Sequence, residues 1–145
     1  MARAISEAPV IRAIRSGSDG EIFASNTEGT ALASAARTAT TTSATLSNPN
    51  ARGVMAFVNI TAASGTGGLQ LRIQAIDPIS GGFVNLNSAP TALVAIATAG
   101  YAVYPGIAVT AGQYTSAALP ASWRISVTHG DASSYTYSVG YSLIY

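Results

Sequence analysis

The chain has 145 residues with seven Arg, no Lys, no Cys, one His and six acidic residues, so its formal net charge is +1. The lack of Cys excludes a disulfide framework, a thiolate metal site and a Cys nucleophile. The small net charge argues against an electrostatic nucleic-acid binder, which needs clustered basic residues. Charged residues make up only 9%, which weakens the usual protection against self-association and suits a subunit of a larger assembly.

The N-terminal part differs from the rest in charge and in pattern. Eight of the thirteen charged residues lie in the first 37 positions, and no sustained hydrophobic period runs through them. The stretch has no apolar core typical of a secretory signal, and no segment of the chain is long and apolar enough to span a membrane. We interpret residues 1–36 as an N-terminal arm or edge strand that makes intersubunit contacts, with Arg3, Arg12 and Arg15 as candidate contact residues.

Residues 37–145 have the patterns of a β-sandwich domain. A short helix is possible over residues 31–37, and the Thr-rich run 38–45 predicts an exposed edge strand because β-branched residues favour extended backbone. Residues 53–60 are apolar on both faces and predict a central strand that is covered on both sides.

The middle of the chain predicts a hairpin followed by two further strands. Apolar and polar residues alternate over residues 69–75, and the turn at 77–82 leads into a returning strand at 83–87. Residues 91–98 and 101–109 are the next two strand candidates.

The C-terminal segment has the most regular pattern. Trp123, Ile125 and Val127 share one face of a strand, and residues 129–134 form a turn. Alternate apolar and aromatic residues then continue to Tyr145, which predicts a C-terminal hairpin of half-buried strands. Turn signals recur at the spacing typical of a sandwich or jelly roll. The predicted fold is a single all-β domain, an antiparallel, jelly-roll-like β-sandwich with an extended N-terminal arm.

Few residues could carry chemistry. His129 is the only His and lies two positions before Asp131, within a turn, where a structural role that caps strand ends is favoured over a catalytic one. Asp77 and Asp131 are isolated carboxylates in turns, which disfavours glycosidase chemistry and calcium binding. The glycines at 65–68 precede a strand and not a helix, so they do not form a phosphate-binding loop. We expect no enzyme activity, no catalytic residue, no cofactor and no metal.

Tyr side chains gather on one face of the last predicted strand. They could stack on sugars or bases, but an apolar ring with a polar tip more often packs at a core edge or a subunit interface. The candidate contact residues there are Tyr135, Tyr137, Tyr141 and Tyr145. Arg52, Arg72 and Arg124 are lone charges in strands, where we expect each to form an ion pair or to stack on an aromatic ring.

Two segments carry a resemblance to a known family. They read Gln-x-x-Asp-Pro-x-Ser-Gly at residues 74–81 and Pro-x-x-Trp-Arg-x-x-Val-x-His-Gly-Asp at residues 120–131. Together with residues 52–61, 104–106 and 137–143, they resemble a family of small proteins encoded in tailed-bacteriophage and prophage genomes. The similarity covers residues 37–145.

The resemblance implies a structural protein of the virion that is assembled in the host cytoplasm. The expected role is a capsid decoration (cement) protein, a homotrimer that binds the major capsid protein on the outside of the head lattice and stabilises it. The alternative is a tail, neck or fibre β-sandwich, with carbohydrate receptor binding as its further possibility. Neither nucleic acid nor membrane is an expected partner, and the family supplies no catalytic residues.

Overall fold

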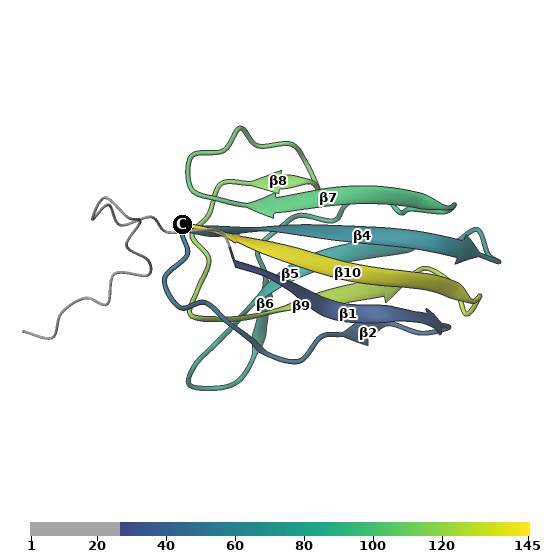
Figure 1. The fold of residues 1–145 in the computed structure, drawn as a ribbon, viewed down its shortest axis with the longest axis horizontal. Helices are drawn as coiled ribbons and strands as arrows, with labels where there is room; N and C mark the ends of the chain where they lie inside the picture. Colours follow the sequence, from purple (N-terminus) through teal and green to yellow (C-terminus); the bar gives the residue numbers. More distant parts are fainter. Residues whose placement is uncertain (1–26) are drawn as a thin grey trace, which may run out of the picture.

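The computed structural model describes residues 27–145, which form ten β-strands (Figure 1). In chain order they are β1 (Thr27–Arg37), β2 (Thr41–Thr42), β3 (Leu46–Ser47), β4 (Gly53–Ala63), β5 (Leu69–Ile76), β6 (Phe83–Asn85), β7 (Ala97–Val103), β8 (Tyr114–Thr115), β9 (Ser122–His129) and β10 (Tyr135–Ile144). This described part contains no helix that could cross a membrane.

The strands form two sheets that pack face to face. The first sheet has the order β1-β10-β4-β7-β8 and the second has the order β2-β9-β5-β6, with β3 also paired to β9. All pairs are antiparallel except β7 and β8. Apart from the short strands β3 and β8, successive strands alternate between the two sheets except at the β5–β6 hairpin, and the resulting strand order is that of a jelly roll. The predicted all-β, jelly-roll-like sandwich is confirmed.

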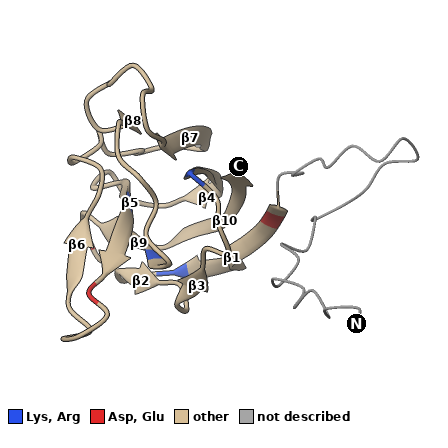
Figure 2. Cartoon of the chain, turned by 90° about the vertical axis from the view of Figure 1, so that its left-hand side faces the viewer, with Lys and Arg blue, Asp and Glu red and all other residues tan. Residues whose placement is uncertain are grey.

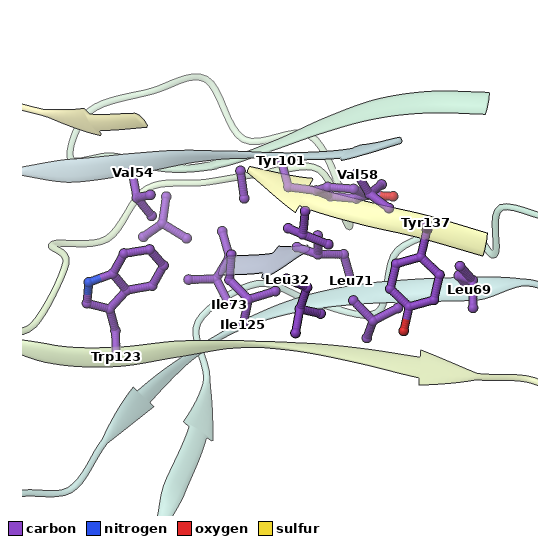
Figure 3. Packing of buried hydrophobic residues seen from close by; sticks show 14 of the residues in the cluster. Leu32, Val54, Val58, Leu69, Leu71, Ile73, Tyr101, Trp123, Ile125 and Tyr137 are labelled. Atoms are coloured by element: carbon purple, nitrogen blue, oxygen red, sulfur yellow. The ribbon is translucent and has the colours of Figure 1, made fainter. Parts of the chain in front are cut away.

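The core lies between the two sheets and is made by alternate residues of the long strands (Figure 3). Trp123 of β9 fills one end, and Tyr137 of β10 and Leu69 of β5 fill the other. Successive side chains of a strand point to opposite faces, so the period of two in the sequence becomes one buried face on each strand. Each large apolar side chain buried in this way contributes about 1.5–3 kcal/mol.

The last two long strands do not form the expected hairpin. β9 pairs with β5 and β2, whereas β10 pairs with β1 and β4, so residues 130–134 are an arch that connects the two sheets. Alternation identifies the apolar face of each strand but not the sheet to which the strand belongs. The loop crosses the roughly 10 Å between packed sheets, and the two apolar faces meet across the core.

The sequence predicts an arm or an edge strand over residues 1–36, and residues 27–36 of this range form an edge strand. They belong to β1, which pairs with β10 at the edge of the first sheet and so is part of the sandwich. The possible helix over residues 31–37 does not form. The free edge of β10 offers backbone partners along the whole segment, and satisfying these groups outweighs the helix propensity of its Ala residues. Only Leu32 of this strand is buried.

Four other predicted strands need smaller corrections. The edge strand at residues 38–45 shrinks to β2, at the edge of the second sheet. The strands predicted at 91–98 and 101–109 are replaced by β7, which runs through Gly100 and ends before the turn at Pro105 and Gly106. β4 is central, as expected, but its outer face is not covered, and Phe57 is 41% exposed there. The hairpin of β5 and β6 is confirmed.

Candidate functional site

The outer face of the first sheet is uncharged across its three inner strands. Alternate residues of β4, β10 and β7 point away from the core there, and we call this surface the Phe57 face. Its members are Met55, Phe57 and Asn59 of β4, Ser138, Gly140 and Ser142 of β10, and Thr98, Gly100 and Ala102 of β7. Figure 2 shows charged residues only as short, scattered segments of the chain.

Phe57 lies at the middle of this face, and its neighbours on both adjacent strands have no side chains to cover it. It pairs with Gly140 on one side and with Gly100 on the other. The Met55 methyl group lies close to Gly100, 3.3 Å from where its Cβ would be. The Phe57 ring also lies against Gly100, with its Cδ1 3.7 Å from where that Cβ would be, and it remains 41% exposed. The face is bordered at Asn59 by a hydrogen bond from the Thr98 hydroxyl (3.0 Å).

The opposite end of the Phe57 face opens into an apolar groove of about 330 Å³. The groove is lined by Met55, Ala102, Tyr104, Ile107, Tyr114 and Ile144. Met55 and Ala102 belong to both features, so the groove continues the face toward β8. Exposed, connected apolar surface of this kind is typical of a protein-binding region.

The outer face of the second sheet has a different chemistry. The Arg124 guanidinium stacks on Phe83, 3.0 Å from the ring centroid, and its Nε donates to Gln74 (2.7 Å). Arg72 donates to the carbonyl of Asn87 (3.0 Å). Arg52 lies elsewhere, directly before β4 of the first sheet, and its guanidinium is 5.7 Å from the ring centroid of Tyr104 at the groove. The prediction that lone Arg residues stack on aromatic rings is confirmed for Arg52 and Arg124.

Asp131 fastens two loops at the arch end of the sandwich. Its Oδ2 accepts a hydrogen bond from the Gly67 amide (2.7 Å), and its Oδ1 accepts one from the Ser133 amide (2.9 Å). These amides, Gly67 first, hold the pKa of Asp131 below its ordinary value because they stabilise the carboxylate. This geometry agrees with the structural role inferred for Asp131.

His129 packs among tyrosines beside that loop. Its Nε2 lies 3.3 Å from the Tyr137 hydroxyl, its ring is edge-on to Tyr135, and its Nδ1 is buried without a partner. Burial lowers the pKa of His129, an effect that Asp131 opposes and Arg37 reinforces. The Asp131 carboxylate is directed at backbone amides instead of the His129 ring, so the pair does not have the geometry of a catalytic dyad.

Asp77, the other carboxylate considered for catalysis or metal binding, also forms hydrogen bonds within its own turn. Asp77 lies in the β5–β6 turn, where it accepts hydrogen bonds from the Ser80 hydroxyl and the Ile79 amide. These bonds, Ser80 first, lower the pKa of Asp77. Within residues 27–145, no three His, Asp or Glu side chains are grouped so that they could hold a metal ion.

The predicted contact residues differ in how exposed they are in the structure. Tyr135 and Tyr137 are completely buried in the core, so they are not surface contacts, which corrects that assignment. Tyr141 is half-buried and packs edge-on against Trp123, with ring centroids 5.2 Å apart. The Tyr145 hydroxyl lies 3.1 Å from that of Thr27. The expected contacts Arg3, Arg12 and Arg15 lie outside the described residues.

The Phe57 face was missed from the sequence, although its signal was present. Residues 53–60 are apolar on both faces, and we interpreted this as a strand with two covered faces. The pattern equally fits a strand with one face in the core and one face available to a partner. No protein-family model and no curated protein matches this chain.

Proposed function

We propose that the protein is a structural subunit of a tailed-phage virion, a decoration protein that binds the capsid through the Phe57 face. The observation that carries the proposal is the exposed Phe57 ring between two glycines, on a sheet whose three inner strands have no charged residue. Aromatic residues at the centre of an interface, with charged residues depleted around them, are typical of the residues that dominate binding energy.

The fold and the resemblance support the virion setting. Jelly rolls occur in viral capsid and lectin domains, so the fold is compatible with both proposed roles, although fold alone does not assign function. The resemblance of residues 37–145 supplies the phage context. A decoration subunit stabilises a shell because it binds the assembled lattice and not the free capsid subunits.

The partner that fits this face is the major capsid protein, at a site with an apolar recess. An uncharged surface provides little electrostatic steering, so recognition depends on shape and on burial of the ring. We propose that the protein binds as a homotrimer, since closed cyclic symmetry lets identical subunits occupy a symmetric lattice site.

Phe57→Ser tests the proposal in a pull-down of full-length protein with expanded empty heads. Losing a central aromatic anchor should weaken binding by about 30-fold, which corresponds to about 2 kcal/mol. The matched control is Val84→Ser, since Val84 is an exposed apolar residue (61%) on β6 of the other sheet. Wild-type binding by the Phe57 variant, or an equal loss in the control, would refute the assignment of this face.

A second candidate is a tail, neck or fibre subunit that binds carbohydrate. It is favoured by a second pocket of about 220 Å³, lined by Pro90, Thr91, Leu93, Tyr101, Ala111 and Gln113. Gln113 gives this pocket an exposed amide, which is the kind of polar group that a sugar site uses. Glycan-array binding that Gln113→Ala abolishes would favour this role, and a hexameric mass in solution would favour a neck or tail ring over a trimer.

A further inference from the structure

The apolar groove at the β8 end of the first sheet has a positive charge beside it. The groove has a volume of about 330 Å³, and none of its lining residues is charged. The Arg52 guanidinium lies 5.7 Å from the ring centroid of Tyr104, one of the lining residues. Arg52 is exposed, so a carboxylate can approach it. A matching occupant therefore combines an apolar side chain with a nearby carboxylate.

The turn between β5 and β6 presents that combination. Ile79 is 95% exposed, more than any other large apolar side chain of residues 27–145. Asp77 lies in the same turn, and its Oδ1 accepts a hydrogen bond from the Ile79 amide (3.0 Å). We call residues 77–80 the Ile79 tip. An aliphatic side chain so fully in water is unfavourable unless another protein covers it.

The other strongly exposed apolar residues outside β6 have no carboxylate near them. Val94, Ile96 and Val109 are 50%, 70% and 69% exposed. No acidic residue occurs in the sequence between Asp77 and Asp131, so none lies close to these three along the chain. Charge complementarity with Arg52 therefore favours Ile79 as the occupant of the groove.

The Ile79 tip is held in one shape by its own hydrogen bonds. The Gly81 amide donates to the Asp77 carbonyl (2.9 Å), and the Asp77 amide donates to the Gly82 carbonyl (2.8 Å). The Ser80 hydroxyl and then the Ile79 amide lower the pKa of Asp77, so its carboxylate is ionised at neutral pH. A preordered tip loses little conformational entropy when it binds.

The tip and the groove of one chain cannot meet. The tip extends the second sheet, whereas the groove is on the outer face of the first sheet, and the core lies between the two. Figures 1 and 2 both show the β5–β6 turn and β8 on different sides of the molecule. The tip that enters a groove must therefore belong to another copy.

We propose that the Ile79 tip of one copy enters the groove of a second copy, with the Asp77 carboxylate beside the Arg52 guanidinium. The tip and the groove are different surfaces, so each copy can offer its groove to the next, and the series closes into a ring where the rotation between copies permits. Three such contacts would close the homotrimer of the proposed function, on which this part of the inference rests. Ring closure strengthens a contact that is small by itself.

Sedimentation equilibrium of the full-length protein tests the contact. Ile79→Asn should weaken self-association at least about tenfold, because it removes the side chain that fills the groove. The matched control, Ile96→Asn, changes the same residue type at another exposed position and should associate like wild type. Arg52→Gln should weaken association about three- to tenfold, because it removes the charge that faces Asp77.

Disulfide trapping identifies the two surfaces that meet, because the chain has no Cys of its own. Under mild oxidation, Ile79→Cys/Ile107→Cys should give covalent species of several chain masses, since Ile107 lines the groove. A mixture of the two single variants should stop at a covalent dimer, because each chain then has one reactive surface. The control Ile96→Cys/Ile107→Cys should cross-link at least about tenfold more slowly.

Several outcomes would overturn the proposal. They are a wild type that stays monomeric at about 0.1 mM, equal losses for the two Asn variants, wild-type association by Arg52→Gln, and cross-links confined to one chain. Dimers formed by Ile79→Cys alone would join two tips and would also overturn it. These measurements use no phage heads. A monomer that still binds heads through Phe57 would refute only this contact, whereas a ring that does not bind heads would refute only the capsid role.

Discussion

Just beyond the end of β6, the side chain of Asn87 forms the hydrogen bonds that a paired strand would make with β5. Its Oδ1 accepts a hydrogen bond from the Ile73 amide (2.8 Å), and its Nδ2 donates to the Leu71 carbonyl (3.0 Å). The side chain is buried, and so are these backbone groups of β5. One amide thereby satisfies two polar groups that would otherwise lie unpaired at the sheet edge.

Asn87→Ala should lower the free energy of unfolding by about 1–3 kcal/mol, because it leaves buried backbone groups unsatisfied. Urea denaturation measures the loss. The control is Asn85→Ala, since Asn85 is exposed and its side chain bonds only Gln74; it should change stability by less than about 0.5 kcal/mol. Equal losses in the two variants would mean that the buried amide has no special role.

His129 should make stability depend on pH. Its folded-state pKa lies below the ordinary value of 6.5, chiefly because the ring is buried. The folded chain therefore resists protonation more than the unfolded chain does, so stability is full above about pH 6.5 and falls as pH drops through that value toward the native pKa. The nearby carboxylate of Asp131 has a pKa below its ordinary 3.8, so it stays charged in this range.

Thermal unfolding of wild type and His129→Gln at about pH 7.5 and about pH 5 measures this effect. Wild type should lose more stability than the variant between the two values, since the variant lacks the imidazole that titrates there. A variant with the same pH dependence as wild type would assign the loss to another residue.

At the scale of elements, two of the loops that connect the sheets are hydrogen-bonded to each other. The loop between β4 and β5 and the loop between β9 and β10 exchange backbone hydrogen bonds, including Gly130 to Gly68 (2.9 Å) and Ser64 to Ser134 (3.0 Å). Gly130 lies against Gly67 so closely that a Cβ on Gly130 would collide with the Gly67 carbonyl oxygen. The contact is possible only because both residues lack side chains.

Gly130→Ala should therefore force the two loops apart and destabilise the fold by about 1–3 kcal/mol. Gly140→Ala is the control, because a Cβ there would meet its nearest neighbour, the Gly29 carbonyl oxygen, at an ordinary 3.6 Å. Differential scanning calorimetry compares the two. Equal melting temperatures would show that the loops adjust without cost.

At the scale of the whole molecule, the outer faces of the two sheets differ in chemistry. The second sheet presents Arg and Gln side chains that are bonded within the chain, whereas the first presents the Phe57 face and the groove. β1 closes the edge of the first sheet, and its two register shifts disrupt the exposed ladder. Such irregularities discourage another strand from adding to an edge.

The domain boundary near Thr27 predicts the result of truncation. Removal of residues 1–26 should leave a cooperatively unfolding protein, because the described core is built within residues 27–145. Removal of residues 1–37 should cause aggregation, since it deletes β1 with Leu32 and exposes the edge of β10. Circular dichroism melts and light scattering distinguish the two. Loss of cooperativity in the shorter deletion would move the boundary toward the N-terminus.

The sequence by itself determined which residues share a face on β5, β9 and β10, the strands with a regular alternating pattern. Alternation over residues 69–75 and from Tyr135 to Tyr145 is a local property of extended backbone, so the all-β sandwich and its core could be predicted without coordinates. The local roles of Asp77 and Asp131 followed from turn chemistry in the same way.

Only the tertiary structure decided which sheet each strand joins and what covers its outer face. The patterns of β9 and β10 fit a hairpin as well as an arch, and the pattern of β4 fits a covered strand as well as an exposed one. The outcome depends on partners far away in the sequence: Gly100 and Gly140 leave Phe57 exposed, and the second sheet buries Tyr135 and Tyr137. Local periodicity contains no information about such distant neighbours, so the candidate site had to come from the packed fold.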